Sequence, residues 1–259
     1  GSMIQTHQNV SDSVVEVVNP DGSSPVVLVC EHASPAIPAP FNNLGLTGDA
    51  LSSHAAWDPG AMAVARIIAQ ELDAVLVASR VSRLVYDCNR PPEAAGAMPA
   101  KSEVFDIPGN ANLTPAERAA RTAAYYTPFR DTLAGVIAAA PSPVIVTIHS
   151  FTPIYHGAQR AVEIGILHDS DTRLADAMLD TAAAHSPHLT QRNAPYGPQD
   201  GVTHTLLEHG ISGGHPNVMI EIRNDLIQTP DTQRGIALQL AGWLTDACAT
   251  VTGENACKA

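Results

Sequence analysis

Short apolar runs alternate along this chain with stretches of helical spacing, and that alternation limits the fold more than any other feature of the sequence. The runs are rich in β-branched residues and cover 26–30, 75–78, 144–148, 162–167 and 217–222. Continuous apolar runs of this length are typical of strands buried on both faces of a sheet. Helical patterns over 59–73, 114–140, 171–185 and 231–252 separate most of them. Strands that alternate with helices predict an α/β fold with a largely parallel central sheet flanked by helices.

Two of the predicted helices carry start signals. Thr114, with Glu117 three residues later, predicts a capping box at the start of the second helix. Asp58 precedes Pro59, which predicts an aspartate cap and a proline in the first turn of the first helix.

The regions between these elements indicate a single domain. Residues 91–113 are rich in Pro, Gly and Ala and show no periodicity, so we expect a long surface loop or lid there. No internal repeat and no linker interrupts the pattern. We therefore expect one domain over residues 3–259, preceded by an expression-tag remnant at Gly1-Ser2.

The charge balance excludes some partners. The chain has 14 Lys+Arg against 26 Asp+Glu, a net charge of -12 that repels phosphate backbones. An arginine in a pocket would give a local positive charge in this otherwise negative protein, which suits a small anionic substrate. No apolar run approaches the ~18 residues that a membrane-spanning helix needs. We expect neither a nucleic-acid nor a membrane partner.

The four cysteines indicate a reducing compartment. Cys30, Cys88, Cys248 and Cys257 have no paired spacing and follow no secretion signal, which predicts reduced thiols in a cytoplasmic protein. Cys30 precedes Glu31-His32 and leaves a thiol nucleophile open, although a buried cysteine at a strand end is the commoner arrangement.

Polar side chains follow four of the predicted strands at their carboxyl ends. In parallel α/β sheets, ligand sites form in the crevice at this edge. His32 and His149 suit the two imidazole ligands of one catalytic Zn²⁺, with a carboxylate as third ligand and water in the open position. Asp58 and Glu31 are the candidate carboxylates. The alternative is that each histidine is a hydrogen-bonded structural residue and that Asp58 only caps its helix.

Glu221 ends an apolar strand, where a carboxylate is costly to bury without a role or a partner. A general base that takes a proton from water on the metal fits this placement. The structural alternative is an ion pair with Arg223 or another arginine.

Several arginines are candidates for binding a substrate carboxylate, since the guanidinium fork matches a carboxylate in a bidentate way. Asn89-Arg90 is favoured, because Pro91-Pro92 stiffens the chain after it. Further candidates are Arg83, Arg160 and Arg223. A glycine-punctuated loop over 193–204 ends on His204, which either reaches the site or is a satisfied loop histidine.

Five short motifs, in order over about residues 25–245, resemble the N-formylglutamate amidohydrolase family. They are VLVCEHAS, WDPGA, SRLVYDCNRP, HSF and IEIR, which contain Glu31-His32, Asp58, Arg83 to Arg90, His149 and Glu221. That family is similar in fold to the zinc carboxypeptidases and aspartoacylases. The resemblance therefore implies a phosphorylase/hydrolase-like domain with a mixed central sheet. It also implies zinc, a water nucleophile and hydrolysis of a small N-acyl acidic amino acid, N-formylglutamate first.

The resemblance carries over residue by residue. It implies His32 and His149 as zinc ligands, Glu221 as base and Asn89-Arg90 as carboxylate anchor. The carboxypeptidase pattern has a glutamate three residues after the first histidine, where this chain has Pro35. The third ligand is thus open among Asp58, Glu31 and, as a reserve, His54.

Two other functions remain open. A carboxypeptidase-like peptidase on short peptides or peptidoglycan fragments is favoured by an open groove, and residues 91–113 are the segment that decides between groove and closed pocket. A non-catalytic protein that binds carboxylates through the arginines, without metal, is the third hypothesis.

Overall fold

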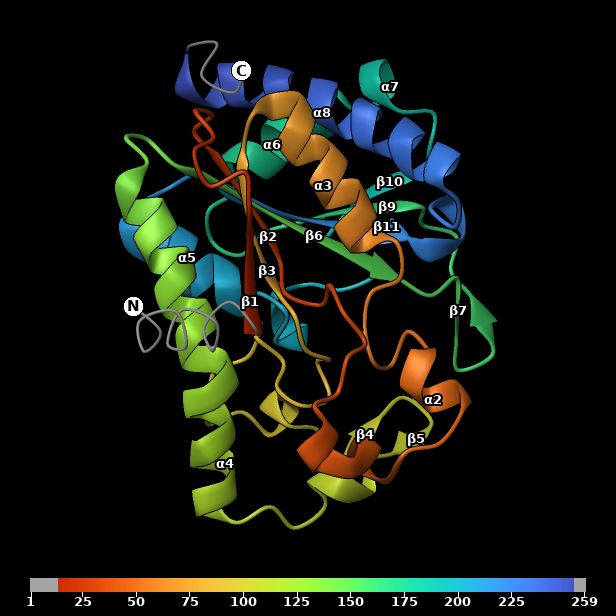
Figure 1. Cartoon of the computed structure of the whole chain (residues 1–259). Coiled ribbons are helices and arrows are strands. Elements are labelled where there is room, and N and C mark those ends of the chain that lie inside the picture. The colour runs from red at the N-terminus through yellow and green to blue at the C-terminus, as the bar shows by residue number, and fades with distance from the viewer. Residues whose placement is uncertain (1–13, 254–259) are drawn as a thin grey trace.

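The computed structural model describes residues 14–253, and the predicted tag remnant at Gly1-Ser2 lies outside them. A seven-stranded sheet organises the described chain, in the order β1-β3-β2-β6-β11-β9-β10 (Figure 1). Its strands are β1 (Val15–Val18), β2 (Val26–Cys30), β3 (Val75–Ser79), β6 (Val144–Phe151), β9 (Ile164–Leu167), β10 (Thr190–Arg192) and β11 (Asn217–Arg223).

Most neighbours in this sheet run parallel. β2 pairs in parallel with β3 and β6, β6 with β11, and β9 with β10. β1 is antiparallel to β3, and β11 is antiparallel to β9. The α/β fold with a mixed, mostly parallel sheet is therefore confirmed.

Helices cover both faces of the sheet. α3, α6 and α8 pack over one face, and α5 covers the other (Figure 1). The α-helices are α2 (Asp49–Ser52), α3 (Ala61–Leu72), α4 (Pro115–Arg121), α5 (Thr127–Ala139), α6 (Arg173–Asp180), α7 (Ala182–His185) and α8 (Pro230–Thr252). π-helical turns cover Thr122–Tyr126 and Leu206–Gly210, and 3-10 turns cover Ala39–Gly45, Ala95–Ala97, Pro108–Asn110, Pro198–Asp200, Ile211–Gly213 and Asn224–Leu226.

The central strands divide their side chains between two cores. In β2, Leu28 packs into the cluster beneath α3 and α8, whereas Val27 and Val29 pack toward α5. This alternation is the period-two geometry of a strand. Every residue of β2 is buried, as its continuous apolar run predicted.

One predicted helix start is confirmed and the other is wrong. Thr114 and Glu117 form the reciprocal capping box at α4. α3 begins at Ala61 with Gly60 at its cap and without a side-chain capping bond, so Asp58 does not cap it. Gly60 has a left-handed φ of 82°, and a Cβ there would lie 2.6 Å from the carbonyl oxygen of Ile227, so glycine is required at this turn.

The long helix expected over 114–140 is interrupted by the π-helical turn Thr122–Tyr126. Pro128 follows that turn, and a proline inside a helix removes an amide donor and clashes with the preceding turn, which explains the interruption. The helix expected over 171–185 is divided into α6 and α7 at Thr181, whose hydroxyl donates to the carbonyl oxygen of Ala177.

The sequence did not predict the edge strands β1 and β10, or two small hairpins. One hairpin, β4 (Lys101–Ser102) and β5 (Phe105–Asp106), lies inside the predicted lid over 91–113. The other is β7 (Ile154–Tyr155) with β8 (Ala158–Gln159). Strands of two to four residues are too short for a periodicity to be visible.

The cysteines only partly match expectation. Cys30 and Cys88 are free and buried. Cys248 is disulfide-bonded, so the prediction of reduced thiols throughout is wrong, and the cysteines no longer argue for a cytoplasmic location.

Within residues 14–253, none of the helices combines the length and the apolar character needed to cross a membrane.

Candidate active site

The ends of three central strands deliver the main residues of the site. His149 lies in β6 and Glu221 in β11, and the two are direct partners in the register of these strands. His32 follows the end of β2, which pairs with β6 on its other side. By the strand alternation, His149 and Glu221 project on the same side of the sheet as Ile145, which packs toward α5. The residues therefore meet at the carboxyl edge of the sheet, as predicted.

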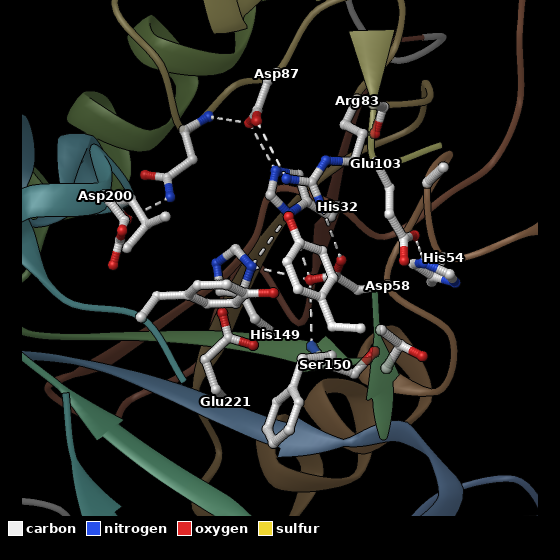
Figure 2. Close-up of a pocket in the computed structure, with 18 of the residues that line it drawn as sticks. His32, His54, Asp58, Arg83, Asp87, Glu103, His149, Ser150, Asp200 and Glu221 are labelled. Carbon is white, nitrogen blue, oxygen red and sulfur yellow. Dashed lines mark hydrogen bonds and ion pairs between the residues drawn. The ribbon is translucent and has the colours of Figure 1, made fainter. Parts of the chain in front are cut away.

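His32, Asp58 and His149 converge at the centre of this edge (Figure 2). The Nδ1 atoms of the two histidines lie 3.2 Å apart, and Oδ2 of Asp58 lies 3.3 Å from that of His32 and 3.0 Å from that of His149. Bonds of about 2.0–2.1 Å in a tetrahedral zinc site place two ligand atoms about 3.3 Å apart. The three atoms thus have the spacing of ligands around one ion.

Asp58 is held in this position from two sides. The backbone N–H of Ser150 donates to Oδ2 at 3.2 Å, and the guanidinium of Arg83 donates to Oδ1 at 3.3 Å. These bonds turn the carboxylate toward the histidines, which is why it does not reach the amides of α3.

Each histidine has a carboxylate behind it. Nε2 of His32 lies 2.6 Å from Oδ1 of Asp87. Nε2 of His149 lies within ion-pair distance of Oε1 of Glu31, at 3.1 Å, although the two atoms are not aligned as a hydrogen bond. The hydroxyl of Thr205 donates to the other oxygen of Glu31 at 2.9 Å. Such partners fix the orientation of a ligating imidazole and raise its basicity.

These contacts separate the three candidates for the third ligand. Glu31 faces Nε2 of His149. His32 lies on the other side of this imidazole ring, where Nδ1 of His149 faces Nδ1 of His32, so Glu31 does not reach both histidines. His54 pairs with Glu103 at the rim of the pocket. Of the three candidates, the structure brings Asp58 to both histidines.

The arrangement fits one cation between the imidazoles. Burial opposes ionisation of Asp87, yet His32 and Arg83 hold its pKa below the ordinary value, so Asp87 is a carboxylate and Nε2 of His32 donates to it. The lone pair on Nδ1 of His32 then faces Nδ1 of His149. Burial alone would lower the pKa of His149, but Glu31 and Asp58 raise it well above its ordinary value. Two imidazole nitrogens and one carboxylate oxygen form a donor set that fits Zn²⁺.

Glu221 is a buried carboxyl group that lines the cavity and has one oxygen without a partner in the described chain. It is 3% exposed, and among residues 14–253 its Oε2 atom has no hydrogen-bond partner. Burial raises the pKa of Glu221 to about 8, against an opposing contribution from His149. Arg223 does not pair with it but holds Asp225 at 2.7 Å, so the expected structural alternative is absent from the described contacts.

Three of the predicted substrate-binding residues line the same pocket. Arg83 and Arg90 reach the other oxygen of Asp87, at 3.5 Å and 3.8 Å. Asn89 lines the pocket too, but its amide donates to the carbonyl of Val202 and accepts from the N–H of Thr205, so it joins two loops. The guanidiniums are therefore placed beside the histidine cluster, and Asn89 holds the wall in place.

Arg160 and Arg223 are not among the residues that line the pocket. The guanidinium of Arg160 stacks over Tyr155 and Tyr196, which do line it, and donates to the hydroxyl of Tyr196 at 3.0 Å. Arg223 donates to the carbonyl of Arg160 and to Asp225. Both arginines support the wall from behind.

Neither Cys30 nor His204 joins the site. Burial, with Asp58 and Glu31 nearby, raises the pKa of the Cys30 thiol well above its ordinary value, which disfavours a thiolate nucleophile. His204 is bonded through Nε2 to the hydroxyl of Tyr126 at 2.6 Å and does not line the pocket.

Comparison with protein families identifies a match over this whole region. The N-formylglutamate amidohydrolase model matches residues 24–228, which contain every residue of the cluster. The chain belongs to the N-formylglutamate amidohydrolase family. Its members are amide hydrolases that act on small N-acyl amino acids, and the resemblance noted in the sequence is confirmed.

The chain is also similar to solved structures. A gene product of Agrobacterium tumefaciens is 54% identical, with a TM-score of 0.91, covering 94% of this chain and 98% of that one. An N-formylglutamate amidohydrolase from Ralstonia eutropha is 18% identical, with a TM-score of 0.57, and the match covers 93% and 99% of the two chains. At that identity the second likeness shows the fold alone. No curated protein matches the chain.

In this member of the N-formylglutamate amidohydrolase family, loops build the rim of a cavity of about 340 Å³. Ser102 and Glu103 from the β4–β5 hairpin line one side, and Glu103 pairs with His54 from the loop after α2. Tyr155 and Tyr196 line other parts of the wall. The predicted lid over 91–113 thus contributes directly to the pocket.

Several functional candidates were missed from the sequence. Asp87 stands inside the SRLVYDCNRP motif, where its place behind His32 had no separate signal. Glu103 lies in a loop whose composition marks only a turn-rich segment. Its pairing with His54 joins residues 49 apart in the chain, which no local pattern could show.

Proposed function

We propose that this chain is a zinc-dependent amidohydrolase that removes a small acyl group from the nitrogen of an amino acid. Family membership supports amide hydrolysis. The observation that supports a metal site is the triangle of His32, Asp58 and His149, whose facing atoms lie 3.0–3.3 Å apart. Glu31 and Asp87 contact the outer nitrogens of the two histidines. A catalytic zinc site has three protein ligands and one open position, and this cluster supplies three.

Zinc bound there would supply a Lewis acid for the acyl carbonyl and would lower the pKa of water in the site. Glu221 would then act as the group that transfers protons. Its carboxylate accepts a proton from the attacking water and passes it to the amide nitrogen as the carbon–nitrogen bond breaks. The products are a carboxylic acid and a free amino acid. A carboxyl group with a pKa of about 8 is protonated at neutral pH, and a cation beside it favours the ionised form that a base requires.

The carboxylate of the amino acid is bound by Arg90, with Arg83 as a second donor. Within residues 14–253, the contacts of the Arg90 guanidinium are a long ion pair to Asp87, at 3.8 Å, and one bond to the carbonyl of Asp200, at 3.2 Å. A guanidinium has five N–H groups in a fixed fork, so donors remain for a substrate. N-formylglutamate is the first substrate to test, as the resemblance and the family both indicate.

The alternative, a carboxypeptidase-like peptidase on short peptides or peptidoglycan fragments, would be favoured by an open groove. The pair between Glu103 and His54 joins the β4–β5 hairpin to the loop before Asp58 and narrows the cavity on that side. A cavity of about 340 Å³ suits a substrate of amino-acid or dipeptide size.

The test is metal analysis followed by hydrolysis. Chain freed of metal by a chelator is reloaded with Zn²⁺, and the metal bound per chain is measured beside turnover of N-formylglutamate and other N-acyl amino acids. We expect about one zinc per chain and turnover that follows zinc occupancy. Binding of substrate without any turnover in the zinc-loaded chain would instead support the non-catalytic carboxylate-binding hypothesis. A cytoplasmic location stays a prediction, which cell fractionation tests.

A further inference from the structure

A chain of hydrogen bonds runs behind the histidine cluster and connects its two sides. On one side, Oδ1 of Asp87 lies 2.6 Å from Nε2 of His32 (Figure 2) and also accepts from the backbone N–H of Asn89 at 3.0 Å. The side-chain carbonyl of Asn89 accepts from the backbone N–H of Thr205 at 2.9 Å. The hydroxyl of Thr205 donates to Oε2 of Glu31, also at 2.9 Å. Thr205 is therefore linked to both carboxylates that face the outer nitrogens of the cluster.

The other end of this chain is the imidazole of His149. Oε1 of Glu31 lies 3.1 Å from Nε2 of His149, and Oε2 is the atom that Thr205 holds. The two oxygens of a carboxylate turn together, so a bond to one of them fixes the direction of the other. Glu31 is 1% exposed and Thr205 is 2% exposed, so solvent contributes little to holding this carboxylate. Among the described contacts, the hydroxyl of Thr205 is the hydrogen bond that orients it.

The local structure does not account for this hydroxyl. Thr205 immediately precedes the π-helical turn Leu206–Gly210, and its side chain makes no capping bond to that turn. A threonine at a helix start usually accepts from a nearby amide, and one inside a helix often donates to a carbonyl of the preceding turn. Thr205 instead donates to a buried carboxylate 174 residues away in the sequence. Because π-helical turns are frequent at functional sites, the placement favours a role in the site.

We propose that Thr205 is a positioning residue of the metal site, acting through Glu31 on His149. This inference rests on the proposed function, because His149 is one of the proposed zinc ligands. With the hydroxyl in place, Glu31 keeps the imidazole turned so that its Nδ1 faces His32 and Asp58. Without it, the buried carboxylate loses its hydrogen bond and is free to rotate away from Nε2. Loss of a partner behind a ligating histidine typically lowers metal affinity or activity by about 10- to 100-fold.

The experiment measures zinc affinity by titrating the metal-free chain with Zn²⁺ in the presence of a competing chromogenic chelator. Thr205→Val replaces the hydroxyl by a methyl group of similar size, and Thr205→Ser keeps a hydroxyl. Thr205→Ala removes the same hydroxyl without adding a methyl group, and it replaces the valine variant if that variant does not fold. Melting temperatures of the metal-free chains, and kcat and KM for N-formylglutamate, are measured beside the affinity.

Thr203→Val is the matched control. Thr203 lies two residues earlier in the same segment, is also 2% exposed, and its hydroxyl also donates to a carboxylate, that of Asp169, at 2.7 Å. It does not line the cavity. The control therefore removes a buried hydroxyl bond of the same kind without touching the partners of the histidines.

We expect Thr205→Val to bind zinc about 10- to 100-fold more weakly than the wild type, and Thr205→Ser and Thr203→Val to bind it with the wild-type affinity. At saturating zinc, kcat of Thr205→Val should fall while KM stays near the wild-type value, because Arg90 is unchanged. A lower melting temperature in both valine variants, with weaker zinc binding in Thr205→Val alone, would separate positioning of the ligand from general stability.

Equal zinc affinities of Thr205→Val and the wild type would overturn this inference and leave the proposed function intact. Zinc binding by Thr203→Val that is as weak as that of Thr205→Val would overturn it as well, because the effect would then belong to the whole segment. A wild-type chain that binds no zinc would overturn both the inference and the proposed function.

Discussion

The floor of the cavity and its rim are built by different parts of the fold. The floor residues His32, His149 and Glu221 come from the ends of β2, β6 and β11 and are at most 4% exposed. The rim pair comes from loops, and the side chain of His54 is 34% exposed. Rigid, buried strands hold groups to within fractions of an ångström, whereas loops tolerate changes of sequence.

This contrast indicates where the chemistry takes place. We infer that the floor carries the chemistry that any amide substrate needs. A change in the floor should therefore affect all N-acyl substrates alike.

The largest expected effect is the loss of a floor ligand. His149→Ala or His32→Ala removes one of the three ligand atoms of the proposed zinc site, so each variant should purify without bound zinc and lose nearly all turnover on every substrate. His185→Ala is the matched control, because this histidine pairs with Asp246 on α8 and is not part of the cluster. Metal content and kcat are measured on all three. A His149→Ala chain that keeps stoichiometric zinc would show that the floor is not the metal site.

The next largest effect concerns the proton carrier in the floor. Glu221→Gln keeps the shape of the side chain but cannot accept a proton, so kcat should fall by roughly 10²–10⁴ while zinc stays bound. The fall should be similar for different N-acyl amino acids, since the proton transfer is common to all of them. A variant that melts at a lower temperature but turns over at the wild-type rate would remove Glu221 from the mechanism.

The same contrast explains what the sequence could and could not predict. The floor residues lie at the ends of buried strands. The apolar runs that end near His32, His149 and Glu221 therefore predicted both the sheet and the edge at which these residues meet. Parallel register then brings His149 beside Glu221 without further information.

Residues whose position depends on tertiary contacts gave no such signal. Asp58 was expected as a helix cap as well as a ligand, and only its bonds to Ser150 and Arg83 decide against the cap. The pairing of Glu103 with His54 depends on how two loops fold against each other. Local sequence patterns indicate burial and turns, but they do not indicate which two distant loops contact each other.

A third prediction addresses the carboxylate end of the cavity. Arg90→Ala should raise KM for N-formylglutamate by roughly 10- to 100-fold, the range for lost hydrogen bonds to a charged group, with a smaller effect on kcat. Arg90→Lys should restore only part of the binding, because an ammonium cannot present the guanidinium fork. Equal KM values for a free acid and its amide in the wild type would show that Arg90 does not bind the carboxylate.

The last prediction concerns the pH dependence of stability in the metal-free chain, which tests the floor without any turnover. The pKa of Glu221 is about 8 in the folded chain, and an exposed glutamate titrates near 4.5. Between these values the folded state keeps a proton that the unfolded state releases, so this group makes the free energy of unfolding fall as pH rises. Its contribution is at most about 1.4 kcal/mol per pH unit and levels off above pH 8. Glu221→Gln removes this contribution, so the variant should gain stability relative to the wild type as pH rises from 5 to 8. Urea unfolding of both chains, with a chelator present and at several pH values, measures the difference. A difference that stays constant across this range would mean that the floor holds Glu221 ionised even without a metal, and that its burial is compensated by the imidazolium of His149.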